Sequence, residues 1–522
     1  MEARGELPIT TLVELSAYNA QDLGDKIALV FKDRHTSFAA FDAHTNQIAN
    51  GLIAAGLKKD DRISFLGRNS DHYFELLFGA MKAGIVVAPI GWRLAEPEVV
   101  TILRNSEAQL LFVERELLRP AYSDDGLPFM RAIMPVNDAD GAFIAWRDSQ
   151  SADKPAVRID PEDVAVQIYT SGTTGAPKGA MLTHANFVKM RAIMSTSGGE
   201  ANKYYPDDIA LLAMPVSHVG GTATGIWALY GGIKSIVAPQ FAPDDVIGFI
   251  RDEGVNNFFL VPAALQTIAR DPRAATTDFS RIRAITYGGS PIPRKLLAEL
   301  LEVFGCGFMQ GYGMTETAAT IVVLLPEEHL GDAPKLNSCG KPLPGVKLQI
   351  RGVDGTILAP GKVGEINVLS PGNMKGYWRD PEATAKALDK DGWLATGDAG
   401  YLDEDGYLYI SDRVKDMIVS GGENIYPAEV ENAIYGHPGV AEVAVVGVPS
   451  ERWGEEVKAV IVRKSGSDVT AEDIMAWARE RIAGFKVPKS VDFLEALPKS
   501  TAGKTLRRNI RAPYWADREK VI

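Results

Sequence analysis

The length, composition and charge of the chain exclude several classes of protein. Its 522 residues exceed what one simple core holds, so two or more domains are expected. Hydrophobic residues make up 46% of the chain and charged residues 23%, as in an ordinary globular protein. Lysine and arginine number 55 against 67 aspartates and glutamates, and the formal charge of −12 argues against a nucleic-acid partner.

Cysteine usage and hydropathy bear on where the protein works. Cys306 and Cys339 are too few for a disulfide framework, and no Cys/His cluster has the spacing of a zinc site. The start, MEARGELPITTL, lacks the apolar core of a signal peptide. The most apolar stretch, Phe74–Trp92, is interrupted by Glu75 and Lys82, which argues against a membrane span. We expect a cytoplasmic protein without integral membrane association, and both a monomer and a homodimer remain open.

The larger part of the chain alternates short apolar strands with helices. A strand at Arg62–Leu66 precedes a helix that Asn69 or Ser70 would cap. The helix runs to about Ala83, and Gly84 ends it. Further strands are expected at Ile85–Ile90, Leu110–Val113, Val164–Ile168, Ile209–Met214, Ser235–Ala238, Phe258–Val261, Ala284–Tyr287 and Phe308–Met309. This alternation predicts βαβ units and largely parallel sheets, in which ligands bind outside the carboxyl ends of the strands.

The character of the sequence changes near Ser338. As far as Ile410, glycine, proline and aspartate separate short alternating strands such as Val346–Arg351, which predicts a small β unit or barrel. The tail predicts helices and strands of its own at Ala428–Tyr435, Ala441–Gly447, Val457–Arg463 and Ala471–Ala483. We therefore predict an α/β protein whose large N-terminal domain, residues 1–411, holds parallel α/β sheets and a β-barrel-like subdomain. A small α+β domain would follow at residues 412–522.

The sharpest chemical signal is YTSGTTGAPKGAMLTH at Tyr169–His184. The strand Val164–Ile168 leads into a loop of glycines and hydroxyl-bearing residues that ends at Lys178. Glycine lets backbone N–H groups approach phosphate oxygens, the hydroxyls add donors and the lysine adds a charge. The predicted phosphate-binding residues are Thr170, Ser171, Gly172, Thr173, Thr174, Gly175 and Lys178. The spacing is not the G-x-x-x-x-G-K-S/T of the common P-loop, and the bland alternative is a polar linker.

At this loop the sequence resembles the adenylate-forming superfamily of acyl-CoA synthetases, peptide-synthetase adenylation domains and beetle luciferases. The resemblance continues in order along nearly the whole chain, with QGYGMTET at Gln310–Thr317, TGD at Thr396–Asp398, SDRVKDMIVSGGENIYP at Ser411–Pro427 and PKSTAGK at Pro498–Lys504. It implies an AMP-forming acid–CoA ligase that uses ATP, Mg²⁺ and CoA. Such an enzyme activates a carboxylic acid as an acyl-adenylate, releases pyrophosphate and passes the acyl group to CoA.

The resemblance also implies a nucleotide site. Glu316 is expected to hold Mg²⁺, and Thr315 to hydrogen-bond the α-phosphate. Asp398 would accept both ribose hydroxyls, with Arg413 near the ribose or its phosphate. Tyr312 and the Gly288–Gly289 loop would form the adenine shelf. Gly313 would allow close backbone approach, and Gly311 is expected among the residues that bind the cofactor. Without the family context, Glu316 would be a solvated surface acid and Tyr312 an ordinary core aromatic.

A moving C-terminal domain follows from the same resemblance. Lys504 would bridge the substrate carboxylate and the α-phosphate during adenylation. Asp412 would be the hinge about which the domain rotates before the thioester forms. Two adjacent glycines would then leave a narrow passage for pantetheine. The residues expected beside CoA are Gly421, Gly422, Phe485 and Lys486.

The acid is the least determined part of the prediction. His218 in MPVSHVGG lies where the family places a residue beside the acyl pocket, and a buried core histidine is the alternative. Ser217 stands where relatives usually carry an aromatic residue. The stretch Gly220–Gly225 is small and uncharged, with no cation to meet a second carboxylate. A medium- to long-chain fatty acid is the first expectation, and an aryl or cinnamate-like acid is the second.

Rival functions remain open at this point. A carrier-protein-loading adenylation enzyme is the nearest, but amino-acid-activating members place an aspartate near His218 and none stands here. An acyl-AMP ligase or a luciferase-like oxygenase is less consistent with SGGEN at Ser420–Asn424. A catalytically silent nucleotide-binding protein would not need the intact set Lys178, Glu316, Asp398 and Lys504.

Overall fold

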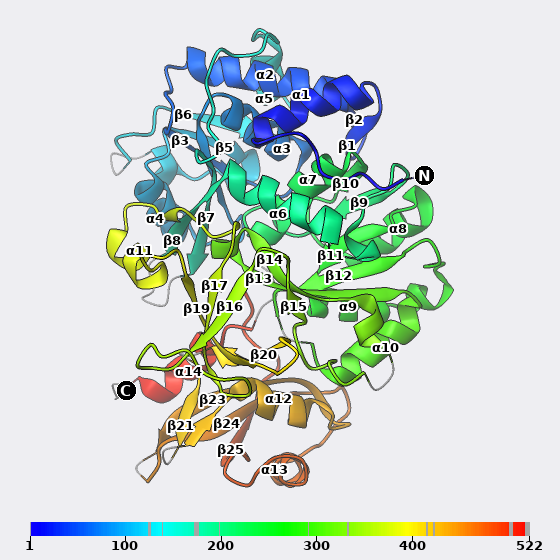
Figure 1. Ribbon diagram of the computed structural model, residues 1–522, viewed down its shortest axis with the longest axis vertical. Coiled ribbons are helices and arrows are strands. Elements are labelled where there is room, and N and C mark those ends of the chain that lie inside the picture. The colour runs from blue at the N-terminus through cyan, green and yellow to red at the C-terminus, as the bar shows by residue number, and fades with distance from the viewer. Residues whose placement is uncertain are drawn as a thin grey trace.

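The computed structural model describes residues 2–123, 127–137, 139–171, 177–197, 199–290, 292–330, 333–413, 416–420, 423–450, 452–500 and 505–516. Figure 1 shows two large sheets with their covering helices, one on the left and one on the right of the upper part, with an antiparallel half-barrel lower down and a small C-terminal unit at the bottom. This is the α/β architecture that the alternation of strands and helices predicts.

The first sheet has the strand order β18-β8-β7-β4-β3-β5-β6. Its strands from β7 to β6 run parallel, whereas β8 and β18 are antiparallel additions at one edge. The bounds are β3 Arg62–Leu66, β4 Val86–Ile90, β5 Leu110–Glu114, β6 Ala132–Val136, β7 Val164–Ser171, β8 Pro177–Thr183 and β18 Gly376–Tyr377. Ser70 caps helix α3, Asp71–Lys82, as predicted, because its hydroxyl accepts the backbone N–H of Tyr73.

The second sheet has the order β15-β14-β13-β12-β11-β9-β10-β1-β2. Strands β13 to β1 are parallel, and antiparallel strands close both edges. The bounds are β1 Ile27–Phe31, β2 Arg34–Ser37, β9 Ile209–Leu212, β10 Lys234–Val237, β11 Asn257–Leu260, β12 Ala284–Gly288, β13 Gly307–Met314, β14 Ala319–Leu324 and β15 Lys341–Pro342.

The half-barrel and the C-terminal unit are smaller sheets. The half-barrel pairs β16, β17, β19 and β20 antiparallel, and the C-terminal sheet has the order β22-β21-β24-β23 with β25 beside β24. Their bounds are β16 Lys347–Arg351, β17 Gly364–Leu369, β19 Leu394–Leu402, β20 Leu408–Arg413, β21 Ile418–Ser420, β22 Glu423–Ile425, β23 Val440–Ser450, β24 Gly454–Arg463 and β25 Ser490–Phe493. The predicted boundary at Asp412 falls inside β20, where Asp412 still pairs with Ala399 of the half-barrel.

Helices cover the faces of these sheets. In the large domain they are α1 Leu12–Leu23, α2 Phe38–Ala54, α4 Glu96–Ser106, α5 Ala142–Asp148, α6 His184–Ser197, α7 Val219–Gly231, α8 Pro243–Glu253, α9 Pro262–Ala269, α10 Arg294–Phe304 and α11 Pro381–Ala387. The C-terminal unit has α12 Pro427–Tyr435, α13 Ala471–Arg479 and α14 Arg507–Arg511. None of the helices in the described ranges combines the length and the hydropathy that a bilayer crossing requires.

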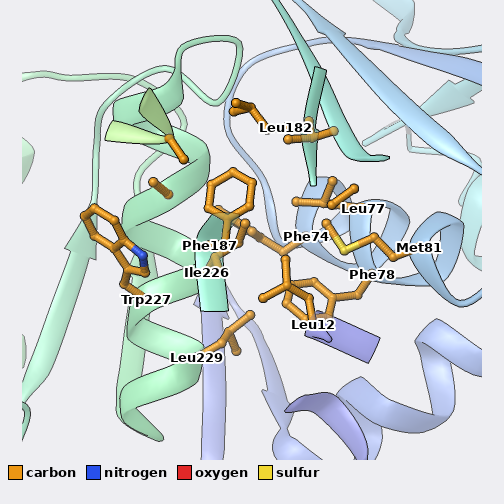
Figure 2. Close-up of a cluster of buried hydrophobic side chains, with 14 of the residues drawn as sticks. Leu12, Phe74, Leu77, Phe78, Met81, Leu182, Phe187, Ile226, Trp227 and Leu229 are labelled. Carbon is orange, nitrogen blue, oxygen red and sulfur yellow. The ribbon is translucent and has the colours of Figure 1, made fainter. Parts of the chain in front are cut away.

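Helix α7 contributes side chains from more than one of its sides to the main hydrophobic core. Ile226, Trp227 and Leu229 all belong to the core cluster that includes Phe74, and Trp227 lies on the side of the helix opposite Phe74 (Figure 2). The contact with α3 is close, since a Cβ on Gly225 would lie 2.1 Å from the ring of Phe74. The side of α7 that carries Trp227 faces the second sheet.

Several segments predicted as loops are strands. The glycine-rich motif is a hairpin whose arms β7 and β8 bring Thr170 opposite Lys178. QGYGM, predicted as a loop after the short strand Phe308–Met309, is the second half of β13. Glycine and small polar residues favour turns, but pairing with a neighbouring strand outweighs that local preference here.

Candidate active site

The carboxylate of Glu316 joins three separate segments of the chain. Glu316 lies in the 3₁₀ turn Thr315–Thr317 that follows β13, and only 6% of the residue is exposed. Its Oε1 accepts a hydrogen bond from the Tyr377 hydroxyl at 2.8 Å and lies 3.5 Å from Thr170 Oγ1. The predicted metal residue thus lies beside the first residue of the predicted phosphate-binding group.

Lys178 adds a positive charge at the same place. Its Nζ lies 5.3 Å from the centroid of the Tyr377 ring, and within the described ranges no carboxylate forms an ion pair with it. Burial and the Glu316 carboxylate raise the pKa of Tyr377, so its hydroxyl stays protonated and donates. Ser171 ends β7, while Gly172, Thr173, Thr174 and Gly175 lie outside the described residues.

Tyr377 was missed by the sequence analysis. It lies 61 residues beyond Glu316, in the short edge strand β18 that pairs with β8. Neither composition nor spacing connects the two residues, because only the pairing of β18 with the hairpin brings them together.

A second tyrosine–carboxylate contact is made by β13, the strand that leads into the turn with Glu316. Tyr312, four residues before Glu316 in the sequence, donates its hydroxyl to Asp398 Oδ2 at 2.8 Å. Burial and the Asp398 carboxylate raise the pKa of Tyr312 well above its usual value. Asp398 also pairs in register with Arg413 across β19 and β20. The structure therefore brings Tyr312, predicted to form the adenine shelf, next to Asp398 and the backbone of Arg413, both of which were predicted near the ribose.

The predicted glycines allow close backbone contacts here. Gly288 and Gly311 pair between β12 and β13, and a Cβ on Gly288 would lie 2.2 Å from the carbonyl oxygen of Gly311. A Cβ on Gly313 would lie 1.7 Å from the carbonyl oxygen of Ala319. Gly289 continues from β12 with a φ of +77°, which side-chain-bearing residues adopt at a cost.

His218 stands directly before helix α7 as its N-cap residue. Its backbone N–H donates to the carbonyl oxygen of Pro215, and Ser217 beside it is buried. Pro215 also lines a cavity of about 230 Å³ whose far wall carries Ser500 of the C-terminal unit. The other lining residues are Asn69, Trp92, Arg93, Ala213, Met214, Pro239, Gln240, Phe241, Val261, Ala263, Ala264 and Thr267. The C-terminal unit therefore meets the large domain at the edge of the predicted acid site.

The remaining predicted residues of the C-terminal unit are placed less directly. Lys486 Nζ lies 2.7 Å from both carboxylate oxygens of Glu429, and Phe485 beside it is 45% exposed. Lys504, Gly421 and Gly422 lie outside the described residues, although Lys499 and Thr505 form a β-bridge on either side of the STAGK segment. The side chains of Asp412 and Arg413 are likewise not described, while their backbone belongs to β20.

A metal ion at this site would have few protein ligands among the described residues. Groups of three or more His, Cys, Asp or Glu side chains able to hold a metal are absent from the described ranges. A Mg²⁺ ion at Glu316 would therefore take its other ligands from phosphate and water oxygens, which is its usual preference.

Comparison with known proteins gives a consistent assignment. The family model described as AMP-binding enzyme matches residues 17–378, and the model described as AMP-binding enzyme C-terminal domain matches residues 429–504. The fatty acid–acyl-carrier-protein ligase ScoC of Streptomyces coeruleorubidus is 39% identical over 515 residues, 98% of each chain. The feruloyl-CoA synthase of an Amycolatopsis species is 40% identical over 481 residues, 92% of this chain and 94% of that protein.

Solved structures agree with the sequence relatives. The crystal structure of ATP-bound MatB from Rhodopseudomonas palustris superposes with a TM-score of 0.88 and 28% identity, covering 97% of this chain and 99% of that one. Both the sequence matches and this structural match extend over nearly the whole chain. The protein therefore belongs to the AMP-binding enzymes, the adenylate-forming superfamily, as an AMP-forming acid–thiol ligase.

Proposed function

We propose that this protein binds ATP, activates a carboxylic acid as an acyl-adenylate with release of pyrophosphate, and transfers the acyl group to CoA. The observation that carries the proposal is the meeting of Glu316, Thr170 and Lys178 at the end of the strand that also holds Tyr312 against Asp398. The 28% identical MatB structure contains ATP, which supports a nucleotide at this place.

The nucleotide would lie along β13. Asp398, held by the Tyr312 hydroxyl, is suited to accept hydrogen bonds from ribose hydroxyls because an ionised carboxylate has several acceptor sites. Gly288, Gly311 and Gly313 let neighbouring segments of the site pack closely, and Gly289, where a Cβ would meet only Val261 Cγ1 at 3.6 Å, leaves room for a flat base against the backbone. The phosphates would then extend toward Thr315, Thr170 and Lys178.

The adenylation step brings two anions together. An oxygen of the substrate carboxylate forms a bond to the α-phosphorus while the bond to the departing pyrophosphate breaks. The protein must hold the line of attack and neutralise charge, which is the task of positioned cations and donors. Lys178 and Lys504 would supply positive charge, Thr315 a hydrogen bond to the α-phosphate, and Glu316 a ligand for Mg²⁺. Bound there, the metal would neutralise phosphate charge.

The thiol acceptor is proposed to be CoA. The feruloyl-CoA synthase supports CoA, whereas the 39% identical ScoC makes a carrier protein the second candidate. The ion pair of Lys486 with Glu429 means that Lys486 would have to exchange Glu429 for a CoA phosphate before it could bind the cofactor.

The acid is proposed to be a fatty acid, with an aryl acid as the second candidate. Each has support from one of the two relatives, one described as acting on a fatty acid and the other as a feruloyl-CoA synthase.

An acceptor assay tests the proposed function directly. With ATP, Mg²⁺ and an accepted acid, we expect acyl-CoA and AMP when CoA is supplied, detected by mass spectrometry. The matched reaction replaces CoA by a phosphopantetheine-bearing carrier protein. Acylation of the carrier protein alone would contradict the CoA assignment while leaving adenylation intact.

The contacts of Glu316 give a second prediction. Glu316→Gln keeps the shape of the side chain but removes its charge, so it should lower the rate of adenylation by about 100-fold or more and raise the Mg²⁺ concentration needed for half-maximal rate. Tyr377→Phe removes only one hydrogen bond to that carboxylate and should cost about 10-fold. Initial rates of pyrophosphate release against Mg²⁺ concentration measure both. An unchanged Mg²⁺ dependence in Glu316→Gln would rule out the metal role.

The proposed rotation of the C-terminal domain predicts opposite defects in two variants. Lys504→Ala should lose adenylation but still convert supplied acyl-adenylate and CoA to the thioester. Asp412→Pro should keep acid-dependent pyrophosphate exchange and lose thioester synthesis, because proline fixes φ near −65° ± about 15° and holds one orientation.

Both variants, Lys504→Ala and Asp412→Pro, need a control that shows they are folded. Asp412 lies in β20, an edge strand of the half-barrel, where proline is tolerated better than in a central strand. Melting temperatures near that of the parent chain would exclude unfolding. Equal loss of both half-reactions in each variant would contradict the division of labour.

A further inference from the structure

A narrow cavity runs along helix α7 behind His218. It has a volume of about 60 Å³ and lies between α6, α7 and the strands of the second sheet. The lining residues are Arg191, Met194, Ala201, Asn202, Tyr204, Ala210, Leu211, Leu212, Gly220, Thr224, Trp227, Asn257, Phe258, Phe259, Thr286, Ala319 and Thr320. Its volume is well below the roughly 300 Å³ at the lower end of sites for drug-sized ligands, so it fits a slender or compact acid.

One end of this cavity borders the proposed active site. Gly220 follows His218 by two residues, and Thr286 precedes Gly288 on β12 by two. Ala319 begins β14, two residues after the Thr315–Thr317 turn. An acid whose carboxyl group reaches Thr315 would therefore extend its remainder into this cavity.

The length of the cavity can be estimated from the residues of helix α7 that line it. Gly220, Thr224 and Trp227 follow one another at helical spacing and form one stripe that lines the cavity. At 1.5 Å per residue, Trp227 lies about 10 Å beyond Gly220, and Tyr230 about 15 Å beyond it.

The far end holds a buried arginine that forms no ion pair with any described residue. Arg191 of α6 is 2% exposed, and its guanidinium carbon lies 4.2 Å from the ring centroid of Tyr204 and 6.0 Å from that of Tyr230. Nη2 donates to the carbonyl oxygen of Asn202 at 3.0 Å, but Nε is buried and has no hydrogen-bond partner among the described residues.

A second unpaired donor lines the same cavity. Trp227 is 6% exposed, and its Nε1 is buried with no hydrogen-bond partner in the part of the chain that the structure describes. Figure 2 places its ring on the side of α7 opposite Phe74. Both groups can only donate, since an indole N–H and a guanidinium have no acceptor. A buried cation and a buried N–H left unpaired cost free energy, and a bound acceptor would remove that cost.

We propose that the substrate of this protein carries a second anionic oxygen group, a carboxylate, about 10 to 15 Å from the carboxyl group that is activated. Arg191 would bind this remote carboxylate and Trp227 would donate a further hydrogen bond to it. The proposal rests on the proposed function, and it narrows the fatty acid to a dicarboxylic one. The stretch Gly220–Gly225 contains no cation, and the positive charge comes instead from Arg191 on α6.

The wild-type enzyme tests this without any substitution. Pyrophosphate release is measured with dicarboxylic acids graded from succinate to dodecanedioate, and with the monomethyl ester of each. At the best length we expect kcat/KM for the diacid to exceed that for its ester by about 100-fold or more, because a site built for a polar group strongly rejects an analogue without it.

The outcomes separate the two proposals. Equal or better turnover of the esters, or of plain fatty acids, would overturn the remote-carboxylate site and leave the ligase function standing. Failure of every carboxylic acid to release pyrophosphate would overturn both.

Substitutions identify the residues responsible. Arg191→Met keeps an apolar side chain of similar length and should reverse the preference in favour of the ester. Trp227→Phe removes the N–H, together with part of the ring, and should lower the diacid-to-ester ratio of kcat/KM by about 10-fold. Arg283→Met is the matched control: Arg283 stacks on Tyr205 and pairs with Asp208 outside the cavity, so the ratio should not change.

Folding of the Arg191 variant needs a check, since Arg191 also holds the Asn202 carbonyl. If its melting temperature falls so far that it is not folded at the assay temperature, Trp227→Phe and the wild-type comparison decide. A ratio unchanged in Trp227→Phe and near one in the wild type would contradict the proposal.

Discussion

The arrangement of the reactive groups depends on the close backbone contact between β13 and β14. The chain leaves β13 at Met314, makes the turn that carries Glu316 and returns as β14, with Met314 paired to Ala319. Glycine at position 313 makes this approach possible, because a Cβ there would collide with the Ala319 carbonyl oxygen. The return also requires Ala318 and Ala319 to adopt φ values of 51° and 85°, which cost about 1–3 kcal/mol each for residues with a side chain. Strain concentrated at one turn is consistent with a site that must hold Glu316 in a fixed position.

Two tyrosines hydrogen-bond the two carboxylates of this site before any ligand binds. Tyr377 donates to Glu316 and Tyr312 donates to Asp398, and burial beside a carboxylate raises the pKa of both phenols. Each carboxylate therefore stays hydrogen-bonded although water is largely excluded. Under the proposed function, phosphate and ribose groups would bind next to partners that are already oriented, and little reorganisation would be needed during the reaction.

The sequence was informative where its signals are local. The alternation of strands and helices, the Ser70 cap and the order of the motifs predicted the sheets and the part of the chain that forms the site. It was wrong where a strand extends further by pairing with the next strand along the chain: β7 continues to Ser171 beside β8, and β13 continues to Met314 beside β14, although loops were predicted there.

Tyr377 and Arg191 could not be found from the sequence for a related reason. Each acts through a contact with a segment remote in the chain or on another element, and Arg191 in HANFVKMRAIM has the appearance of an ordinary helix-surface cation. Its burial depends on Tyr204 and Tyr230, which only the fold brings to it. The family and the reaction class follow from motifs, whereas the choice of acid depends on such long-range contacts.

The central claim is that the acid attacks the α-phosphorus of ATP. Oxygen-18 in both carboxyl oxygens of an accepted acid follows that bond directly through a complete turnover with thiol. We predict that AMP carries one labelled oxygen in its phosphate per turnover, seen by mass spectrometry. The thiol attacks the acyl carbon, and the bridging oxygen, which came from the acid, stays on phosphorus. Label found in inorganic phosphate together with ADP would mean an acyl-phosphate intermediate and would contradict the account.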